Sequence, residues 1–106
     1  MMTTADFIPL IRERIVTGFS PEKIILFGSQ ARENPSLDSN IDLLVVFSSL
    51  NDKRETSIKI RRALADLPVC KDIFVTTPEE IETRGHLVGD VLKPALEEGK
   101  VLYDRG

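Results

Sequence analysis

A single carboxylate inside an apolar strand constrains this chain more than any other feature. Residues 24–47 read IILFGSQARENPSLDSNIDLLVVF. This pattern predicts an apolar strand, a Gly-Ser turn that opens a short helix, a polar loop and a second apolar strand. Asp42 lies within the second strand. Because burying an unpaired carboxylate costs several kcal/mol, the fold must give Asp42 either water or a positively charged partner.

The rest of the chain alternates between helical and strand patterns. We expect helices over residues 3–19, from just after 52 to about 67, from 78 onward and over 86–98. We expect strands over residues 24–27, 41–47, 69–75 and 100–103. This order predicts one α+β domain over residues 1–106, built as a small mixed β-sheet flanked by helices.

Composition limits the classes of function. The net charge is −3 and the pI is about 5.1, which argues against non-specific nucleic-acid binding. Cys70 is the only cysteine, so the chain has no internal disulfide, and its apolar context predicts a small buried thiol. No apolar run is long enough to span a bilayer and no signal peptide opens the sequence, so we expect a cytoplasmic protein.

A second carboxylate accompanies the first. Alternation along the strand at 41–47 places Asn40, Asp42 and Leu44 on one face, and the strand at 69–75 contains Asp72. Two carboxylates that converge on one patch repel each other unless a positive group lies between them, and Mg²⁺ or Mn²⁺ suits oxygen ligands. The Gly28-Ser29 turn offers backbone N–H groups to a phosphate. These parts suit a nucleoside triphosphate bound through a metal ion.

The residues at this point resemble a known family. A Gly-Ser pair at 28–29, then ten intervening residues and Asn-Ile-Asp at 40–42, is similar to the signature of polymerase-β-type nucleotidyltransferases. The fuller strings FGSQAR and SNIDLLV resemble its minimal nucleotidyltransferase (MNT) subfamily. The resemblance includes Asp72 and the Thr-Pro-Glu-Glu helix start at 77–80. It implies a polymerase-β-like fold and transfer of a nucleoside monophosphate from a triphosphate to a hydroxyl.

The resemblance also implies a role for each site residue. The nucleotide-binding positions are Gly28, Ser29 and Arg32, although a solvated position or a structural salt bridge suits Arg32 equally well. The metal-binding and catalytic positions are Asn40, Asp42 and Asp72, and Asp72 also accepts the proton of the attacking hydroxyl. The implied cofactor is Mg²⁺ (or Mn²⁺) and the implied substrate is ATP. The implied partner is a HEPN-domain toxin, which MNT antitoxins neutralise, some of them by transferring AMP to a tyrosine.

One residue departs from the family pattern. The family has a carboxylate where this chain has Asn40, and a unit-charge pair about 4 Å apart is worth roughly 4 kcal/mol at an effective dielectric near 20. We therefore expect catalysis to be impaired. Asn40 is compatible with an engineered replacement of Asp and with a natural member that binds without turnover. Asp38 would substitute as a ligand only if the strand began earlier, which the Pro35-Ser36 pair disfavours.

Simpler interpretations stay open beside these. Asp42 and Asp72 would need no metal on a strand face exposed to water. The alternative function is a non-catalytic antitoxin that neutralises a HEPN ribonuclease by direct contact. The basic cluster of Arg54, Lys59, Arg61 and Arg62 is typical of a solvated helix face, and it could also meet an acidic partner or nucleic acid.

Overall fold

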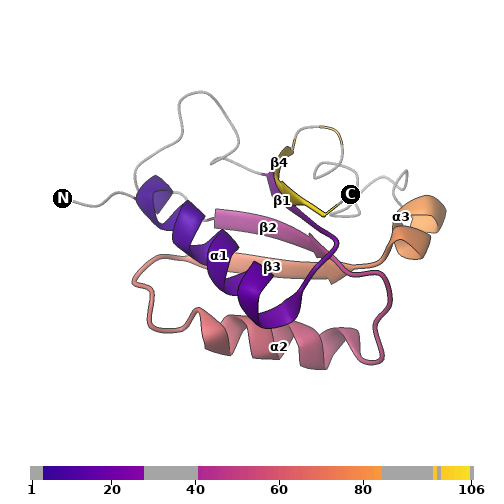
Figure 1. The fold of residues 1–106 in the computed structure, drawn as a ribbon, viewed down its shortest axis with the longest axis horizontal. Helices are drawn as coiled ribbons and strands as arrows, with labels where there is room; N and C mark the ends of the chain where they lie inside the picture. The colour runs from indigo at the N-terminus through magenta and orange to yellow at the C-terminus, as the bar shows by residue number, and fades with distance from the viewer. Residues whose placement is uncertain (1–3, 28–40, 85–96, 98, 106) are drawn as a thin grey trace.

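The structure is a computed structural model that describes residues 4–27, 41–84, 97 and 99–105 (Figure 1). The helices are a 3₁₀ turn at Thr4–Phe7, α1 at Ile8–Phe19, α2 at Lys53–Ala63 and α3 at Pro78–Arg84. The strands are β1 at Lys23–Phe27, β2 at Ile41–Val46, β3 at Lys71–Thr76 and β4 at Lys100–Asp104. The described strands follow the predicted order along the chain.

The strands form a four-stranded mixed sheet in the order β3-β2-β1-β4. β1 pairs antiparallel with both β2 and β4, whereas β2 and β3 run parallel. Parallel neighbours cannot be joined by a tight turn, and here α2 makes the crossover between them (Figure 1). The predicted mixed sheet flanked by helices is therefore present in the described residues.

The main hydrophobic core lies between one face of the sheet and the helices α1 and α2. Ile11 and Ile15, which are four residues apart and therefore on one face of α1, are both fully buried. From the second helix, Ile60 is buried against the same cluster, as is Leu64 just after the helix ends. The sheet contributes residues at alternate positions: Ile24, Leu26, Ile41, Leu43, Val45, Ile73 and Val75.

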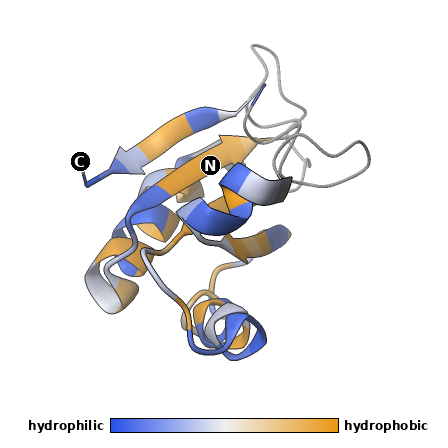
Figure 2. Ribbon diagram, turned by 90° about the vertical axis from the view of Figure 1, so that its right-hand side faces the viewer, coloured by the Kyte–Doolittle hydropathy of each residue, from blue (hydrophilic) through white to orange (hydrophobic). Residues whose placement is uncertain are grey.

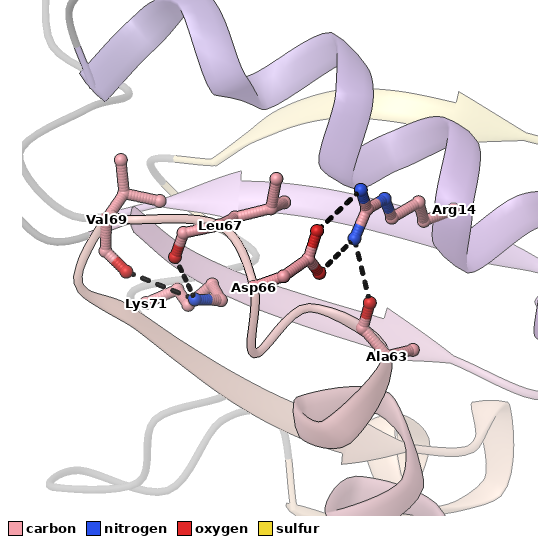
Figure 3. A network of polar contacts seen from close by, with 6 residues as sticks. All are labelled: Arg14, Ala63, Asp66, Leu67, Val69 and Lys71. Carbon is pink, nitrogen blue, oxygen red and sulfur yellow. Dashed lines mark hydrogen bonds and ion pairs between the residues drawn. The ribbon is translucent and has the colours of Figure 1, made fainter.

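A polar network joins α1 to the turn after α2 (Figure 3). The two terminal nitrogens of the Arg14 guanidinium, Nη1 and Nη2, donate to the Asp66 carboxylate, and Nη2 lies 3.0 Å from Oδ2. Arg14 Nη1 also donates to the carbonyl of Ala63 at 3.1 Å. The hydrogen bond from Arg14 lowers the pKa of Asp66 below its ordinary value, and the same bond raises the pKa of Arg14. This bidentate contact fixes α1 against the C-terminal end of α2.

Side-chain caps start two of the helices. Asp52 precedes α2 and its Oδ1 accepts a hydrogen bond from the backbone N–H of Glu55 at 3.0 Å. Thr77 precedes α3 and its Oγ1 accepts from the N–H of Glu80 at 3.2 Å, as the sequence of this segment predicts. At the C-terminal end of α1, Ser20 adopts a left-handed conformation with φ 49°, which terminates the helix.

Two predictions at the junction of α2 and β3 are wrong. The helix ends at Ala63 rather than near residue 67, because the apolar spacing that suggested a longer helix continues through a turn in which Leu64 and Leu67 are buried. Cys70 is exposed, not buried, because it precedes β3. Its backbone carbonyl accepts a hydrogen bond from the N–H of Ile41 at 2.9 Å.

Three other predictions fall outside the described residues. They are the short helix after Gly28-Ser29, the polar loop up to residue 40 and nearly all of the helix predicted over 86–98. Among the residues that are described, no helix combines the length and the apolar character needed to cross a membrane.

Candidate functional site

The most unusual feature of the described structure is a pair of aspartates on neighbouring strands. Asp42 is the second residue of β2, Asp72 is the second residue of β3, and the two are register partners across the parallel pair. Their neighbours Ile41 and Ile73 belong to the core beneath α1 and α2. Because side chains alternate along a strand, both carboxylates lie on the opposite face of the sheet.

An apolar patch borders the acidic pair on that face. Ile25, Phe27, Leu44 and Val46 form a second buried cluster, against which Phe74 and Ile81 pack. Phe27 is the register partner of Asp42 in β1, and Phe74 follows Asp72 by two residues in β3. The rings of Phe27 and Phe74 lie 5.7 Å apart between centroids. The two carboxylates are therefore half-buried beside aromatic surface, which limits their access to water.

This environment disfavours the charged form of Asp42. Burial raises the pKa of Asp42, and the negative charge of Asp72 and a hydrogen bond with Asp72 raise it further. A raised carboxylate pKa means that ionisation of both groups is unfavourable without a compensating charge. The pair therefore favours either a shared proton or a bound cation.

Lys71 is a cation beside the acidic pair in sequence, and no local pattern shows where its side chain is bonded. It directly precedes Asp72, so alternation places its side chain on the other face of β3. Its Nζ donates to the carbonyls of Leu67 and Val69, each at 3.1 Å (Figure 3). Lys71 is thus committed to the segment that leads into β3 rather than to the acidic pair.

The described residues contain part of the predicted site. Asp42 and Asp72 are brought together as the alternation pattern predicts. Gly28, Ser29, Arg32 and Asn40 lie outside the described residues, so their predicted roles stay predictions. In the part of the chain that is described, no group of three or more Asp, Glu, His and Cys side chains could hold a metal ion. The described part of the candidate site therefore offers the two carboxylates of Asp42 and Asp72.

The ends of the described segments border this site. Phe27, the last described residue before the segment 28–40, is the register partner of Asp42. Ile41, the first described residue after that segment, is the neighbour of Asp42 in β2. The segment that contains the Gly-Ser pair and Asn40 therefore leaves and re-enters the described structure at the end of the sheet where the acidic pair lies.

Comparison with known proteins agrees with this fold. Residues 11–106 match the protein family described as polymerase beta, nucleotidyltransferase. The structure is similar to that of a proposed nucleotidyltransferase from Sulfolobus solfataricus, with a TM-score of 0.62 and 20% identity over 91% of this chain and 76% of that one. It is also similar to a mutant of the toxin-antitoxin MntA-HpeT, with a TM-score of 0.51 and 21% identity over 97% of this chain and 74% of that one.

These structural similarities establish the fold. No protein with curated annotation matches the chain significantly. The predicted polymerase-β-like fold is confirmed by the family match and by the Sulfolobus structure together.

Proposed function

Because the chain belongs to the polymerase beta nucleotidyltransferase family, we propose that it is an antitoxin that transfers AMP from ATP to a hydroxyl group of a HEPN-domain toxin. The observation that carries the proposal is the register-matched pair of Asp42 and Asp72 on the face of the sheet opposite α1 and α2. Two half-buried carboxylates at adjacent positions suit the binding of a divalent cation at which a triphosphate is held.

The donor set is suitable for Mg²⁺ or Mn²⁺. Asp42 and Asp72 would provide hard oxygen ligands. Burial, together with the charge of Asp72, raises the pKa of Asp42, and a bound cation would favour its ionised form. When bound, the metal ion would neutralise phosphate charge and orient the triphosphate. Gly28 and Ser29 would hold the β- and γ-phosphates through backbone N–H groups, with Arg32 as a further contact. The Asp72 carboxylate would accept the proton of the attacking hydroxyl, for which it must be ionised.

Asn40 gives the proposed site one negative charge fewer than the family pattern has. An amide carbonyl can coordinate a metal ion, but it carries no net charge to offset that of the cation. The chain would therefore bind a metal ion and ATP less tightly than a member with three carboxylates, and would transfer AMP more slowly. Restoring a carboxylate at this position is the most direct way to expose the proposed activity.

Two observations support a toxin as the acceptor. The sequence strings around the Gly-Ser pair and Asp42 resemble those of MNT antitoxins, and the fold is shared with a structure of the toxin-antitoxin MntA-HpeT. A tyrosine hydroxyl is the proposed acceptor group. Its oxygen would attack the α-phosphate, its proton would pass to Asp72, and pyrophosphate would leave.

The test is a transfer assay with ATP labelled at its α-phosphate, Mg²⁺ and a HEPN-domain protein encoded beside this chain. We expect weak labelling with the wild-type chain, strong labelling with Asn40→Asp and none with the double variant Asn40→Asp/Asp72→Asn. The phosphodiester bond between AMP and a tyrosine oxygen would be checked by mass spectrometry of the labelled partner. Absence of label from Asn40→Asp with each of the four common ribonucleoside triphosphates would overturn the enzymatic proposal.

The second candidate function is neutralisation by contact alone. Asn40 favours it, because a missing charge matters little to a protein that only binds. This alternative predicts that Asp42→Ala and Asp72→Ala still rescue growth of cells that express the toxin. If these variants form the complex but fail to rescue growth, contact alone is insufficient.

A further inference from the structure

The outer side of α2 carries three arginines around one exposed isoleucine. Arg54, Ile58, Arg61 and Arg62 follow the spacing i, i+4, i+7 and i+8, which places them on one stripe of the helix. This stripe, here called the arginine face, is opposite Ile60, which is buried against the sheet. Figure 2 shows the outer side of α2, the lowest helix in the view, as largely hydrophilic.

The three arginines have no acidic partner in the described part of the chain. The basic residues elsewhere on α2 do: Lys53 pairs with Glu80 at 2.6 Å and Lys59 pairs with Glu55 at 3.1 Å. Among the described residues, no side-chain hydrogen bond or ion pair involves Arg54, Arg61 or Arg62. Three guanidinium groups without a side-chain partner among the described residues therefore gather on one helix of a chain whose net charge is −3.

Ile58 gives this charged face an apolar centre. The residue is 37% exposed. Arg54 lies one helical turn before it and Arg62 one turn after it. A shallow hollow of about 400 Å³ adjoins it. The hollow is lined by Asp52, Arg54, Glu55, Ile58, Lys59 and Arg62. Arginine around an apolar anchor is the composition that protein interfaces favour at their centres.

We propose that the arginine face is a docking site for an acidic protein surface that presents one apolar side chain to Ile58. The partner carboxylates would pair with Arg54, Arg61 and Arg62, and each guanidinium can bind a carboxylate through two parallel hydrogen bonds. The apolar side chain of the partner would enter the hollow beside Ile58. Charge complementarity thus identifies the occupant: carboxylates for the arginines and an aliphatic group for the centre.

Nucleic acid suits this face less well than an acidic protein. The face covers eight residue steps of helix, about 12 Å, so it would contact only two or three phosphates of a strand. Affinity from so few phosphate contacts is weak at physiological salt. A phosphate backbone would also leave the exposed side chain of Ile58 without an apolar partner.

The arginine face and the acidic pair lie on opposite sides of the sheet. α2 covers the face that contains Ile41 and Ile73, whereas Asp42 and Asp72 point away from that face. A partner bound at α2 would leave the acidic pair accessible to nucleotide. The inference therefore does not depend on the transfer activity proposed above.

The test measures binding of three probes to the full chain at physiological salt by NMR titration. The first probe is a helical peptide with glutamates around a single leucine, the second is the same peptide with glutamine in place of glutamate, and the third is a single-stranded RNA of equal length. We expect only the glutamate peptide to bind, with the largest shifts at the backbone amides of Arg54, Ile58, Arg61 and Arg62. Tighter binding of RNA, binding of the glutamine peptide alone, or no binding of any probe would overturn the proposal.

Two variants with the same change in net charge test whether the peptide binds at the arginine face. Arg61→Glu/Arg62→Glu should weaken binding of the glutamate peptide at least tenfold. Lys100→Glu/Arg105→Glu changes the net charge equally at exposed positions on and after β4, and it should weaken binding less than threefold. Equal losses in both variants would mean that only overall charge matters, which contradicts docking at α2. Asp72→Asn, which would stop the proposed transfer, should leave peptide binding unchanged.

Discussion

Asp42 of β2 and Asp72 of β3 are register partners on parallel strands and share the face of the sheet that α1 and α2 leave uncovered. Burial and the charge of Asp72 together raise the pKa of Asp42, so the unliganded pair is unfavourable when both groups are ionised. Functional sites commonly contain such strain, because the ligand that relieves it is bound more tightly. Metal binding and thermal stability should therefore be coupled at this pair.

Removing one charge of the pair should stabilise the metal-free chain. We expect Asp72→Asn to raise the melting temperature by a few degrees in EDTA, since about 1 kcal/mol shifts it by roughly 4–8 °C in a domain of this size. The same variant should lose most of the rise in melting temperature that Mg²⁺ gives the wild type. Differential scanning calorimetry with and without Mg²⁺ measures both effects.

Glu82→Gln is the matched control, because Glu82 is an exposed acidic residue of α3 outside the pair. It should change neither the melting temperature nor the response to Mg²⁺. A lower melting temperature for Asp72→Asn in EDTA would mean that the ionised pair is stabilising, contrary to the expected repulsion.

The contact between Arg14 and Asp66 should make stability depend on pH in acid. Arg14 holds the pKa of Asp66 below its ordinary value of 3.8. The stabilisation from this pair is therefore fully present above that value and is lost as the pH falls through the lower pKa of the folded chain. Wild type should be more resistant to urea than Asp66→Asn at pH 7, and the difference should shrink below pH 3.8.

A second variant separates charge from geometry at this contact. Arg14→Lys keeps the positive charge but cannot donate two parallel hydrogen bonds to Asp66 and a third to Ala63. We expect its urea midpoint at pH 7 to lie below that of wild type. A midpoint equal to that of wild type would show that the bidentate geometry contributes nothing.

Two isoleucines of α2 provide a test of which face is buried. Ile60 is fully buried in the core, whereas Ile58, two residues earlier, is 37% exposed. Ile60→Ala should cost about 2–5 kcal/mol of unfolding free energy, because it leaves a cavity. Ile58→Ala should cost less than about 1 kcal/mol, because its side chain already contacts water. Chemical denaturation measures both, and similar costs would contradict the orientation of α2.

The sequence predicts the framework of this fold well, for reasons that particular residues illustrate. Ile11 and Ile15 lie four apart and are buried, and the Thr-Pro-Glu-Glu segment starts a helix through the cap at Thr77. Alternation in β2 places Asp42 opposite the core residues Ile41 and Leu43. Such local patterns depend only on the geometry of a helix or a strand, so a single sequence reveals them.

Features that depend on pairing between distant segments were less predictable. No local pattern specifies that Asp42 and Asp72 are exact register partners, because register follows from how β2 and β3 pack against α2. The contact of Arg14 with Asp66 joins residues 52 positions apart and leaves no periodic signal. The end of α2 was missed because Leu64 and Leu67 keep helical spacing in a turn.

The exposure of Cys70 gives a simple chemical test of that junction. An exposed thiol should react with a disulfide reagent such as DTNB in the native chain as fast as in the urea-unfolded chain, within about tenfold. The apolar sequence around Cys70 predicted the opposite, a thiol that reacts only after unfolding. Cys70→Ser is the control for reagent specificity, and protection of the thiol by several orders of magnitude would contradict the exposed position.

A carboxylate at position 40 should increase both the metal affinity and the transfer rate of the proposed site. At an effective dielectric near 20, a charge pair about 4 Å apart is worth roughly 4 kcal/mol, which corresponds to a factor of about a thousand. We therefore expect Asn40→Asp to bind Mg²⁺ and ATP at least tenfold more tightly by calorimetry, and to transfer AMP up to about a thousandfold faster. Asn40→Ser, which also removes the amide but adds no charge, should show neither gain. If Asn40→Asp and Asn40→Ser bind Mg²⁺ equally, the side chain at position 40 does not contact the metal ion, and Asp42 and Asp72 would have to hold it without a third carboxylate.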